Sequence, residues 1–183
     1  MMKDYENAQK PKTVHRFDWG AWRPKWKEGV DLPTYVVILN LYSETETCEM
    51  DEHCRKVVKE LQLHHKLKLK LPDIAFNFLI GGNGVIYKGR GWTTNSERTK
   101  GKYKIYDGKC HEVCLLGDWR EKEPPLIMLD AFRKLIAYGI RKKFVDPTYE
   151  IIERKEGILP PKTPDIDVAK HVPETTVVEQ LAQ

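Results

Sequence analysis

Residues 74–92 constrain the fold of this chain more than any other stretch. They read IAFNFLIGGNGVIYKGRGW, in which two apolar runs flank the turn sequence GGNG at 81–84. Glycine and asparagine supply the positive-φ backbone of a tight turn, so the pattern predicts a β-hairpin. Arg90 and Trp92 follow the second run beside glycines, which let another backbone approach closely. We therefore expect this strand end to form the wall of a ligand groove.

The length and composition allow one domain with its own core. The chain has 183 residues, of which 40% are hydrophobic and 32% are charged. No stretch approaches the roughly 20 apolar residues of a membrane span, and residues 1–12 lack the apolar core of a signal peptide. We expect a soluble chain, and an excised ectodomain would have the same pattern. The net charge of +4 is spread along the chain, which suits an acidic ligand and gives no indication of nucleic acid.

Four cysteines form two local pairs, and neither pair has the C-x-x-C spacing of a zinc site. Cys48 and Cys54 lie across a predicted loop-to-helix junction, where a disulfide is geometrically possible and would indicate an oxidising compartment. Cys110 and Cys114 lie on one predicted strand, about 13 Å apart from the rise per residue. That distance is too long for a disulfide, so we expect two buried thiols.

Alternating patterns along the chain predict an α/β fold. Apolar runs predict core strands at 35–39 and 111–116 and a last short strand within 144–152. Apolar side chains at helical spacing predict one helix over about 50–65 and a second over 126–139. Strands that alternate with helices indicate a single α/β domain with helices packed on a mixed sheet.

Three irregular segments separate these elements. Trp19, Trp22 and Trp26 predict an amino-terminal segment anchored over the core by its rings, and indole clusters can also bind sugars. Alternating Lys and Leu at 66–70 predict a connector with a solvated basic side. The polar, glycine-containing residues 93–109 predict a long exposed loop, a common location for function.

Several blocks of this sequence together resemble a peptidoglycan recognition protein. Their order and spacing agree with that family over residues 16–149. The blocks are 16–21 (RFDWGA), 35–38 (YVVI), Cys48 and Cys54, 73–82 (DIAFNFLIGG) and 85–92 (VIYKGRGW).

The resemblance implies the amidase-like α/β fold of that family. This fold is a single domain with a central mixed, mostly parallel β-sheet, about three flanking α-helices and a long groove for a muramyl peptide. The resemblance also implies that Cys48 and Cys54 form the family's disulfide. We place the domain at 15–172, after a disordered or linker segment at 1–14 and before a tail at 173–183 with a weak helical pattern.

Active members of this family are zinc amidases, and the chain departs from their site. The resemblance implies that two His and one Cys hold the metal and that a Tyr assists the reaction. Asn40, Arg154 and Lys162 stand at the three ligand positions, and Phe76 replaces the Tyr. Residues 115–170 contain no Cys or His. Catalytic zinc needs three protein ligands, and cations repel it, so we predict neither a metal cofactor nor amidase activity.

The groove residues leave two interpretations open. Arg90-Gly91-Trp92 is similar to the motif of members that prefer meso-diaminopimelate peptides, in which a guanidinium grips a carboxylate. Arg98 stands where a family His contacts the peptide, and Phe76 makes the groove floor less polar. Apolar or bulky replacements leave peptide hydroxyls and amides without partners. Arg90 and Trp92 can therefore also serve the scaffold without any ligand.

These features predict a non-catalytic family member that acts in innate immune signalling or its regulation through protein contacts, with peptidoglycan binding weak or lost. The expected partners are other receptors of the family or a second copy of the chain. A receptor for a diaminopimelate-type muropeptide is the alternative, and a residual amidase is the third. The expected location is extracellular, as a secreted protein or a receptor ectodomain whose membrane anchor lies outside this sequence, and the alternative location is cytoplasmic.

Overall fold

A six-stranded mixed sheet forms the centre of the computed structural model, which describes residues 5–25, 29–96 and 101–157. The strand order is β1-β4-β3-β5-β2-β6. The strands are β1 (Thr13–Val14), β2 (Thr34–Asn40), β3 (Phe78–Ile80), β4 (Ile86–Lys88), β5 (Cys110–Leu115) and β6 (Val145–Arg154). Strands β3 and β4 pair antiparallel, and the other neighbours in the sheet pair parallel. The predicted mixed, mostly parallel sheet is confirmed.

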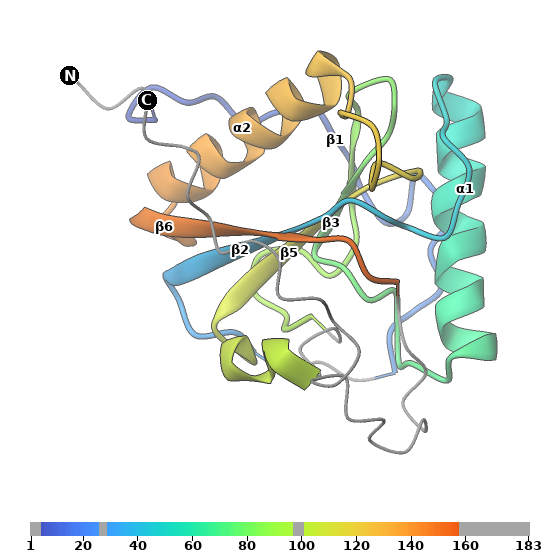
Figure 1. Cartoon of the computed structure of the whole chain (residues 1–183), viewed down its shortest axis with the longest axis horizontal. Helices are drawn as coiled ribbons and strands as arrows, with labels where there is room; N and C mark the ends of the chain where they lie inside the picture. The colour runs from blue at the N-terminus through green and yellow to red at the C-terminus, as the bar shows by residue number, and fades with distance from the viewer. Residues whose placement is uncertain (1–4, 26–28, 97–100, 158–183) are drawn as a thin grey trace.

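Two α-helices, α1 (Asp51–Leu63) and α2 (Leu126–Arg141), cover opposite faces of the sheet (Figure 1). A π-helical turn (His64–Lys68) continues α1, and a 3-10 helix (Gly101–Tyr106) packs on the same face as α1. The described residues therefore contain two α-helices, where the resemblance implied about three.

Helix α2 runs past its predicted end at Gly139. Gly139 does not cap the helix. Its role is to make room for an indole, because a Cβ at this position would lie 2.6 Å from the Trp92 ring. The absence of a side chain thus serves the packing of α2 on the sheet, which local sequence does not reveal.

Alternate residues of β5 face the two helices, as the period of a strand requires. Val113 and Leu115 pack against α2, whereas Cys114 packs in the core beneath α1. Both free cysteines, Cys110 and Cys114, are buried, as expected. Burial raises the pKa of the Cys110 thiol, so this sulfur stays protonated and unreactive at neutral pH.

The predicted hairpin is present, although its first strand is shorter than the apolar run. Strands β3 and β4 pair across the turn at 81–84, where Gly84 has a φ of 73°. Residues 74–77 are irregular yet fully buried. Gly81 packs against the bridge between Cys48 and Cys54, because a Cβ there would lie 2.9 Å from the Cys54 Sγ. The turn of the hairpin therefore rests on a disulfide.

That disulfide joins Cys48 to Cys54 across a Cα–Cα distance of 5.1 Å. It ties the loop before α1 to the first turn of the helix, as the family resemblance implied. Both residues are buried in the core that α1 shares with the sheet.

We expect the Cys48→Ser/Cys54→Ser variant to lose about 2 kcal/mol of unfolding free energy, because the bridge restrains a short loop of the unfolded chain. Urea denaturation with and without reductant measures the effect. Reductant should lower the midpoint of the native protein and leave that of the double variant unchanged. Equal sensitivity of the two proteins to reductant would contradict this prediction.

The sheet begins inside the segment that was predicted as a linker at 1–14. Strand β1 pairs in parallel with β4, so the packed part of the chain includes Thr13. Trp19 is buried and donates its Nε1 hydrogen to the Lys88 carbonyl at 3.0 Å, whereas Trp22 is 47% exposed. Trp26 and the tail at 173–183 lie outside the described residues. No helix in the described part of the chain is long and apolar enough to cross a membrane.

Candidate functional site

Two of the three predicted ligand positions meet at the carboxyl ends of neighbouring strands. Asn40 ends β2 and Arg154 ends β6, and the two residues are direct partners in the parallel register. Both side chains are buried, with exposed fractions of 1% and 6%. The fold therefore places these two predicted positions side by side. Lys162, the third position, lies outside the described residues.

A carboxylate that was not predicted from the sequence contacts both of these side chains. Glu112 of β5 is fully buried. Its Oε1 accepts a hydrogen bond from Ser96 Oγ at 2.9 Å, and its Oε2 accepts one from Asn40 Nδ2 at 3.1 Å. Arg154 Nη1 lies 3.8 Å from the same Oε2. A charged residue inside an apolar strand was a usable signal, because a buried carboxylate requires a partner.

The cover of this polar cluster comes from the segment that was predicted as an exposed loop. Residues 93–109 instead contain the 3-10 helix, and Asn95, Ser96 and Tyr103 in this segment are buried. The Arg154 guanidinium carbon lies 4.4 Å from the centre of the Tyr103 ring, in a cation–π contact. Thr93, Lys104, Asp107 and Lys109 are exposed, as predicted for this segment, whereas the burial of Asn95, Ser96 and Tyr103 was not predicted.

Asn77 holds the segments of this cluster in place. Its Oδ1 accepts the Glu112 backbone N–H at 2.8 Å, and its Nδ2 donates to the carbonyls of Gly91 and Thr94, each at 2.8 Å. One amide thus joins β5 to the segment that follows the hairpin. Asn77 lies immediately before β3, at the end of the buried irregular segment 74–77.

The donor set of this cluster does not fit a zinc ion. The family implies two imidazoles and a thiolate, whereas Asn40 offers an amide and Arg154 offers a cation. Asn40 Oδ1 is buried and has no hydrogen-bond partner among the described residues, but a single amide oxygen is a poor zinc ligand. A guanidinium beside the only carboxylate of the cluster opposes a second cation. Within the residues that the structure describes, no group of three or more His, Cys, Asp or Glu is arranged to hold a metal.

The Arg90 side chain is buried and donates hydrogen bonds within the domain. Its exposed fraction is 7%, its Nε donates to the Ile74 carbonyl at 2.7 Å, and its Nη1 donates to the Asn95 carbonyl at 2.8 Å. These bonds clamp the segment before β3 to the segment after the hairpin. The geometry favours the scaffold interpretation of Arg90 over a carboxylate grip.

Trp92 also packs inward, beneath α2. Its ring stacks on Phe144 with centroids 5.2 Å apart and contacts Phe78 at 4.6 Å and His111 at 5.0 Å. Gly91, which precedes it, is buried and has a φ of 73°. The predicted groove motif is therefore part of the core packing. Arg98, the remaining predicted groove residue, lies outside the described residues.

Phe76 lies in the core beneath α1. It is fully buried and meets the His65 ring edge-on at a centroid distance of 5.8 Å. His65 is buried as well, and its Nδ1 accepts the Ala75 backbone N–H at 3.0 Å. His64, which precedes His65 in the π-helical turn, is exposed.

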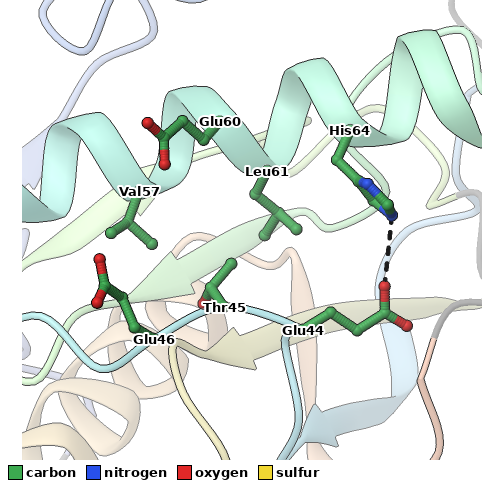
Figure 2. A pocket seen from close by; sticks show the side chains of 7 residues that line it. All are labelled: Glu44, Thr45, Glu46, Val57, Glu60, Leu61 and His64. Carbon is green, nitrogen blue, oxygen red and sulfur yellow. Dashed lines mark ion pairs between the residues drawn. The ribbon is translucent and has the colours of Figure 1, made fainter.

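A separate pocket of about 340 Å³ opens between α1 and the segment that follows β2 (Figure 2). Three carboxylates line it, and His64 Nε2 lies 3.5 Å from a Glu44 carboxylate oxygen across its mouth. The other lining residues are Thr45, Glu46, Val57, Glu60 and Leu61. The predicted groove residues Arg90 and Trp92 do not line it, so the open cavity is acidic and lies apart from the motif that was expected to bind a carboxylate.

Comparison with known proteins identifies the family. A family model described as N-acetylmuramoyl-L-alanine amidase matches residues 30–173. Peptidoglycan-recognition protein LB of Drosophila melanogaster is 34% identical over 145 residues, which cover 79% of this chain and 61% of that protein. A peptidoglycan recognition protein of Trichoplusia ni is 30% identical over 146 residues, which cover 80% of this chain and 78% of that protein. The chain belongs to the peptidoglycan recognition proteins.

Solved structures of peptidoglycan recognition proteins have the same fold as this chain. Wild-type Drosophila PGRP-LB matches with a TM-score of 0.72 at 36% identity, covering 78% of this chain and 81% of that one. The ectodomain of the Drosophila transmembrane receptor PGRP-LCa matches with a TM-score of 0.72 at 30% identity, covering 76% and 83%. The amidase-like fold that the sequence resemblance implied is therefore confirmed.

Proposed function

We propose that this peptidoglycan recognition protein is non-catalytic and acts in innate immune signalling or its regulation through protein contacts, with muropeptide binding weak or lost. The observation that carries the proposal is the buried cluster of Asn40, Glu112 and Arg154. In an amidase of this family, zinc ligands would come from these strand ends. Here an ion pair and its hydrogen bonds occupy the same place.

The chemistry of this cluster supports the loss of catalysis. Hydrolysis by a zinc amidase uses a metal-bound water that is polarised by the ion. Arg154 supplies a fixed positive charge to Glu112, but a guanidinium cannot bind and deprotonate water as zinc does. Phe76 has no hydroxyl and is fully buried, so it offers no hydrogen bond to a reacting peptide.

The packing of the groove motif supports weak or absent peptide binding. To bind the carboxylates of a muropeptide, a groove needs hydrogen-bond donors that face solvent in the free protein. Arg90 donates to two backbone carbonyls, and Trp92 packs against Phe144 beneath α2. A ligand would have to compete with these internal contacts.

A muropeptide receptor remains the second candidate, because relatives bind such ligands. A mutant of Drosophila PGRP-LB, 37% identical to this chain, was solved in complex with tracheal cytotoxin. PGRP-LE, 27% identical, was solved with the same compound, described as monomeric diaminopimelic acid-type peptidoglycan. The Arg90-Gly91-Trp92 motif is the feature of this chain that favours this candidate. A residual amidase is the third candidate.

The proposed partners are other receptors of the family or a second copy of the chain. This proposal is supported by the solved complex of the PGRP-LCa and PGRP-LCx ectodomains with tracheal cytotoxin. We propose an extracellular location because the disulfide between Cys48 and Cys54 forms in oxidising compartments. A cytoplasmic location is the alternative.

Titration calorimetry with tracheal cytotoxin distinguishes the first two candidates. We expect no saturable heat from this chain, because the groove donors are occupied internally. Drosophila PGRP-LB, titrated in parallel, is the positive control. Saturable one-to-one binding that is lost in an Arg90→Ala variant, but not in an exposed-site variant such as Lys122→Ala, would overturn the proposal in favour of a receptor.

An amidase assay addresses the third candidate. The chain, incubated with zinc and polymeric peptidoglycan, should release no peptide above a protein-free control, and the dialysed protein should retain no stoichiometric zinc by mass spectrometry. Peptide release together with bound zinc would contradict the non-catalytic assignment.

A further inference from the structure

A basic and apolar surface lies beside the carboxyl-terminal end of α1, apart from both the buried cluster and the pocket in Figure 2. We define the Trp22–Leu67 patch as the residues that line an open pocket of about 490 Å³: Trp22, Arg23, Lys25, Lys66 and Leu67. In Figure 1 the amino-terminal segment that carries Trp22 runs along this end of the helix. None of these residues belongs to the predicted groove.

Two apolar side chains of the patch are exposed. Trp22 is 47% exposed and Leu67 is 50% exposed. Leu67 lies in the π-helical turn with Lys66 before it and Lys68 after it in the sequence. An indole and a leucine that lie among cations form the combination that enters the interfacial region of a bilayer.

The backbone beneath Trp22 is held firmly in place. Its N–H donates to Gln62 Oε1 at 2.8 Å, and its carbonyl accepts from Gln62 Nε2 at 3.0 Å and from Arg16 Nη2 at 2.7 Å. Lys59 Nζ lies 5.4 Å from the centre of the indole ring. The ring is thus presented by a structured segment, and its exposure results from the way the segment packs on α1.

The charged side chains that line the patch in the described part of the chain are all cations. Arg23, Lys25, Lys68 and Lys70 are exposed and form no ion pair within the described residues. Lys66 donates to the carbonyls of Arg23 and Pro72 and is not neutralised by a carboxylate at contact distance. Burial, together with nearby Lys25, Arg16 and Arg90, lowers the pKa of Lys66, although Asp73 opposes this effect. Asp73 itself is buried and paired with Arg16 at 3.0 Å.

The size of the patch decides which kind of partner it suits. Two half-exposed apolar side chains offer roughly 200 Å² at most, against about 800 Å² on each side of a stable protein–protein interface. A free inorganic anion would use the cations and leave the indole and Leu67 in water. An anionic lipid surface uses both, because lipid headgroups attract lysine and arginine while the interface accepts the apolar side chains.

We propose that the Trp22–Leu67 patch binds the surface of an anionic phospholipid membrane, with a headgroup in the pocket and Trp22 and Leu67 at the interface. Such binding is peripheral and reversible. It holds whether or not the chain binds a muropeptide, since the two surfaces share no residue.

Vesicle co-sedimentation of the whole chain tests the proposal. We expect binding to phosphatidylcholine vesicles that contain about one third phosphatidylglycerol, and little binding to pure phosphatidylcholine. Raising the ionic strength should release the protein. Lys25→Glu should weaken binding about tenfold or more, because one attraction becomes a repulsion. Leu67→Ser should weaken binding several-fold without changing net charge.

Lys122→Glu is the matched control, because it makes the same charge change at an exposed site between β5 and α2. An equal loss of vesicle binding in Lys25→Glu and Lys122→Glu would overturn the proposal, since it would show that the net charge of the protein alone attracts it to the vesicles. Equal binding to neutral and anionic vesicles, or no binding to either, would also overturn it. Binding of soluble polyglutamate without binding of anionic vesicles would reject a lipid surface in favour of an acidic protein partner.

Discussion

Replacing Arg154 by methionine is expected to lower the free energy of unfolding by about 3–5 kcal/mol. Methionine keeps an apolar stem against Tyr103 but removes the positive charge beside Glu112. The Glu112 carboxylate has no exposed surface, so among the described residues the variant would leave it with its bonds to Ser96 and Asn40. A buried charge without its counter-ion is the dominant cost. Guanidinium denaturation at neutral pH measures the loss.

Two further variants test whether the loss comes from that carboxylate. In Glu112→Gln/Arg154→Met the uncompensated charge is absent, so the double variant should be more stable than Arg154→Met alone. Arg120→Met removes a guanidinium from an exposed ion pair with Asp118, and we expect little change there because water screens the pair. A small and equal loss in Arg154→Met and Arg120→Met would show that the buried pair does not hold the strand ends together.

Lowering the pH from 7 to 4 is expected to remove about 3 kcal/mol of stability through His111 alone. Burial lowers the pKa of this imidazole from 6.5 to about 4, against a smaller opposite effect of its bond to Trp92. Because the folded pKa lies below the unfolded one, the unfolded chain binds the extra proton between these two values. Stability is therefore complete above pH 6.5 and falls as the pH drops towards 4.

The hydrogen bonds of His111 explain why it stays neutral. Its Nε2 lies 2.7 Å from the Trp92 carbonyl and must donate to it, which leaves Nδ1 to accept from the Thr34 hydroxyl at 2.8 Å. A second proton on Nδ1 would turn this acceptor into a donor in a fully buried place. The His111→Gln variant lacks the pH-dependent contribution of this imidazole to stability. The unfolding free energies of the native protein and the variant should therefore converge by about 3 kcal/mol between pH 7 and pH 4. Parallel stability curves, or a pKa near 6.5 for His111 by NMR titration, would contradict this prediction.

The buried cluster of Asn40, Glu112 and Arg154 gives a physical account of how this end of the sheet is stabilised in the amidase-like fold. Parallel strands bring Asn40, Glu112 and Arg154 to one end of the sheet on one face. Polar groups at such a place must be paired, because the interior does not solvate them. An ion pair with flanking hydrogen bonds meets that requirement. The same strand ends, which the family resemblance matched to ligand positions, are therefore stabilised by pairing within the domain.

Local pattern was sufficient for several features of this chain. The GGNG turn between two apolar runs predicted the hairpin of β3 and β4, because positive-φ residues at that place permit few other structures. Apolar periodicity predicted α1 and α2, since each helix must bury one face. The family resemblance matched the residues at 40 and 154 to ligand positions, and the parallel register of β2 and β6 places these two residues side by side.

Other features were not predicted because the residues they contact are distant in sequence. Residues 93–109 appeared exposed from their polar composition, yet Ser96 and Tyr103 are buried against Glu112 and Arg154. Gly139 was predicted to end α2, whereas the absence of a side chain there leaves space for the Trp92 ring, which comes from another segment. Such pairings carry no local signal.

Arg90 shows the difference between what local sequence predicts and what the tertiary structure decides. From the sequence, an arginine between glycines and before a tryptophan predicts equally a carboxylate grip or a scaffold clamp. Its burial and its bonds to Ile74 and Asn95 favour the clamp. The residues of this chain were enough to identify its family and its hairpin, because the motifs of both have short, characteristic spacings, and the family resemblance implied its disulfide. The direction in which Arg90 and Trp92 point was decided by long-range packing, because a buried side chain takes its partners from segments that only the folded chain brings together.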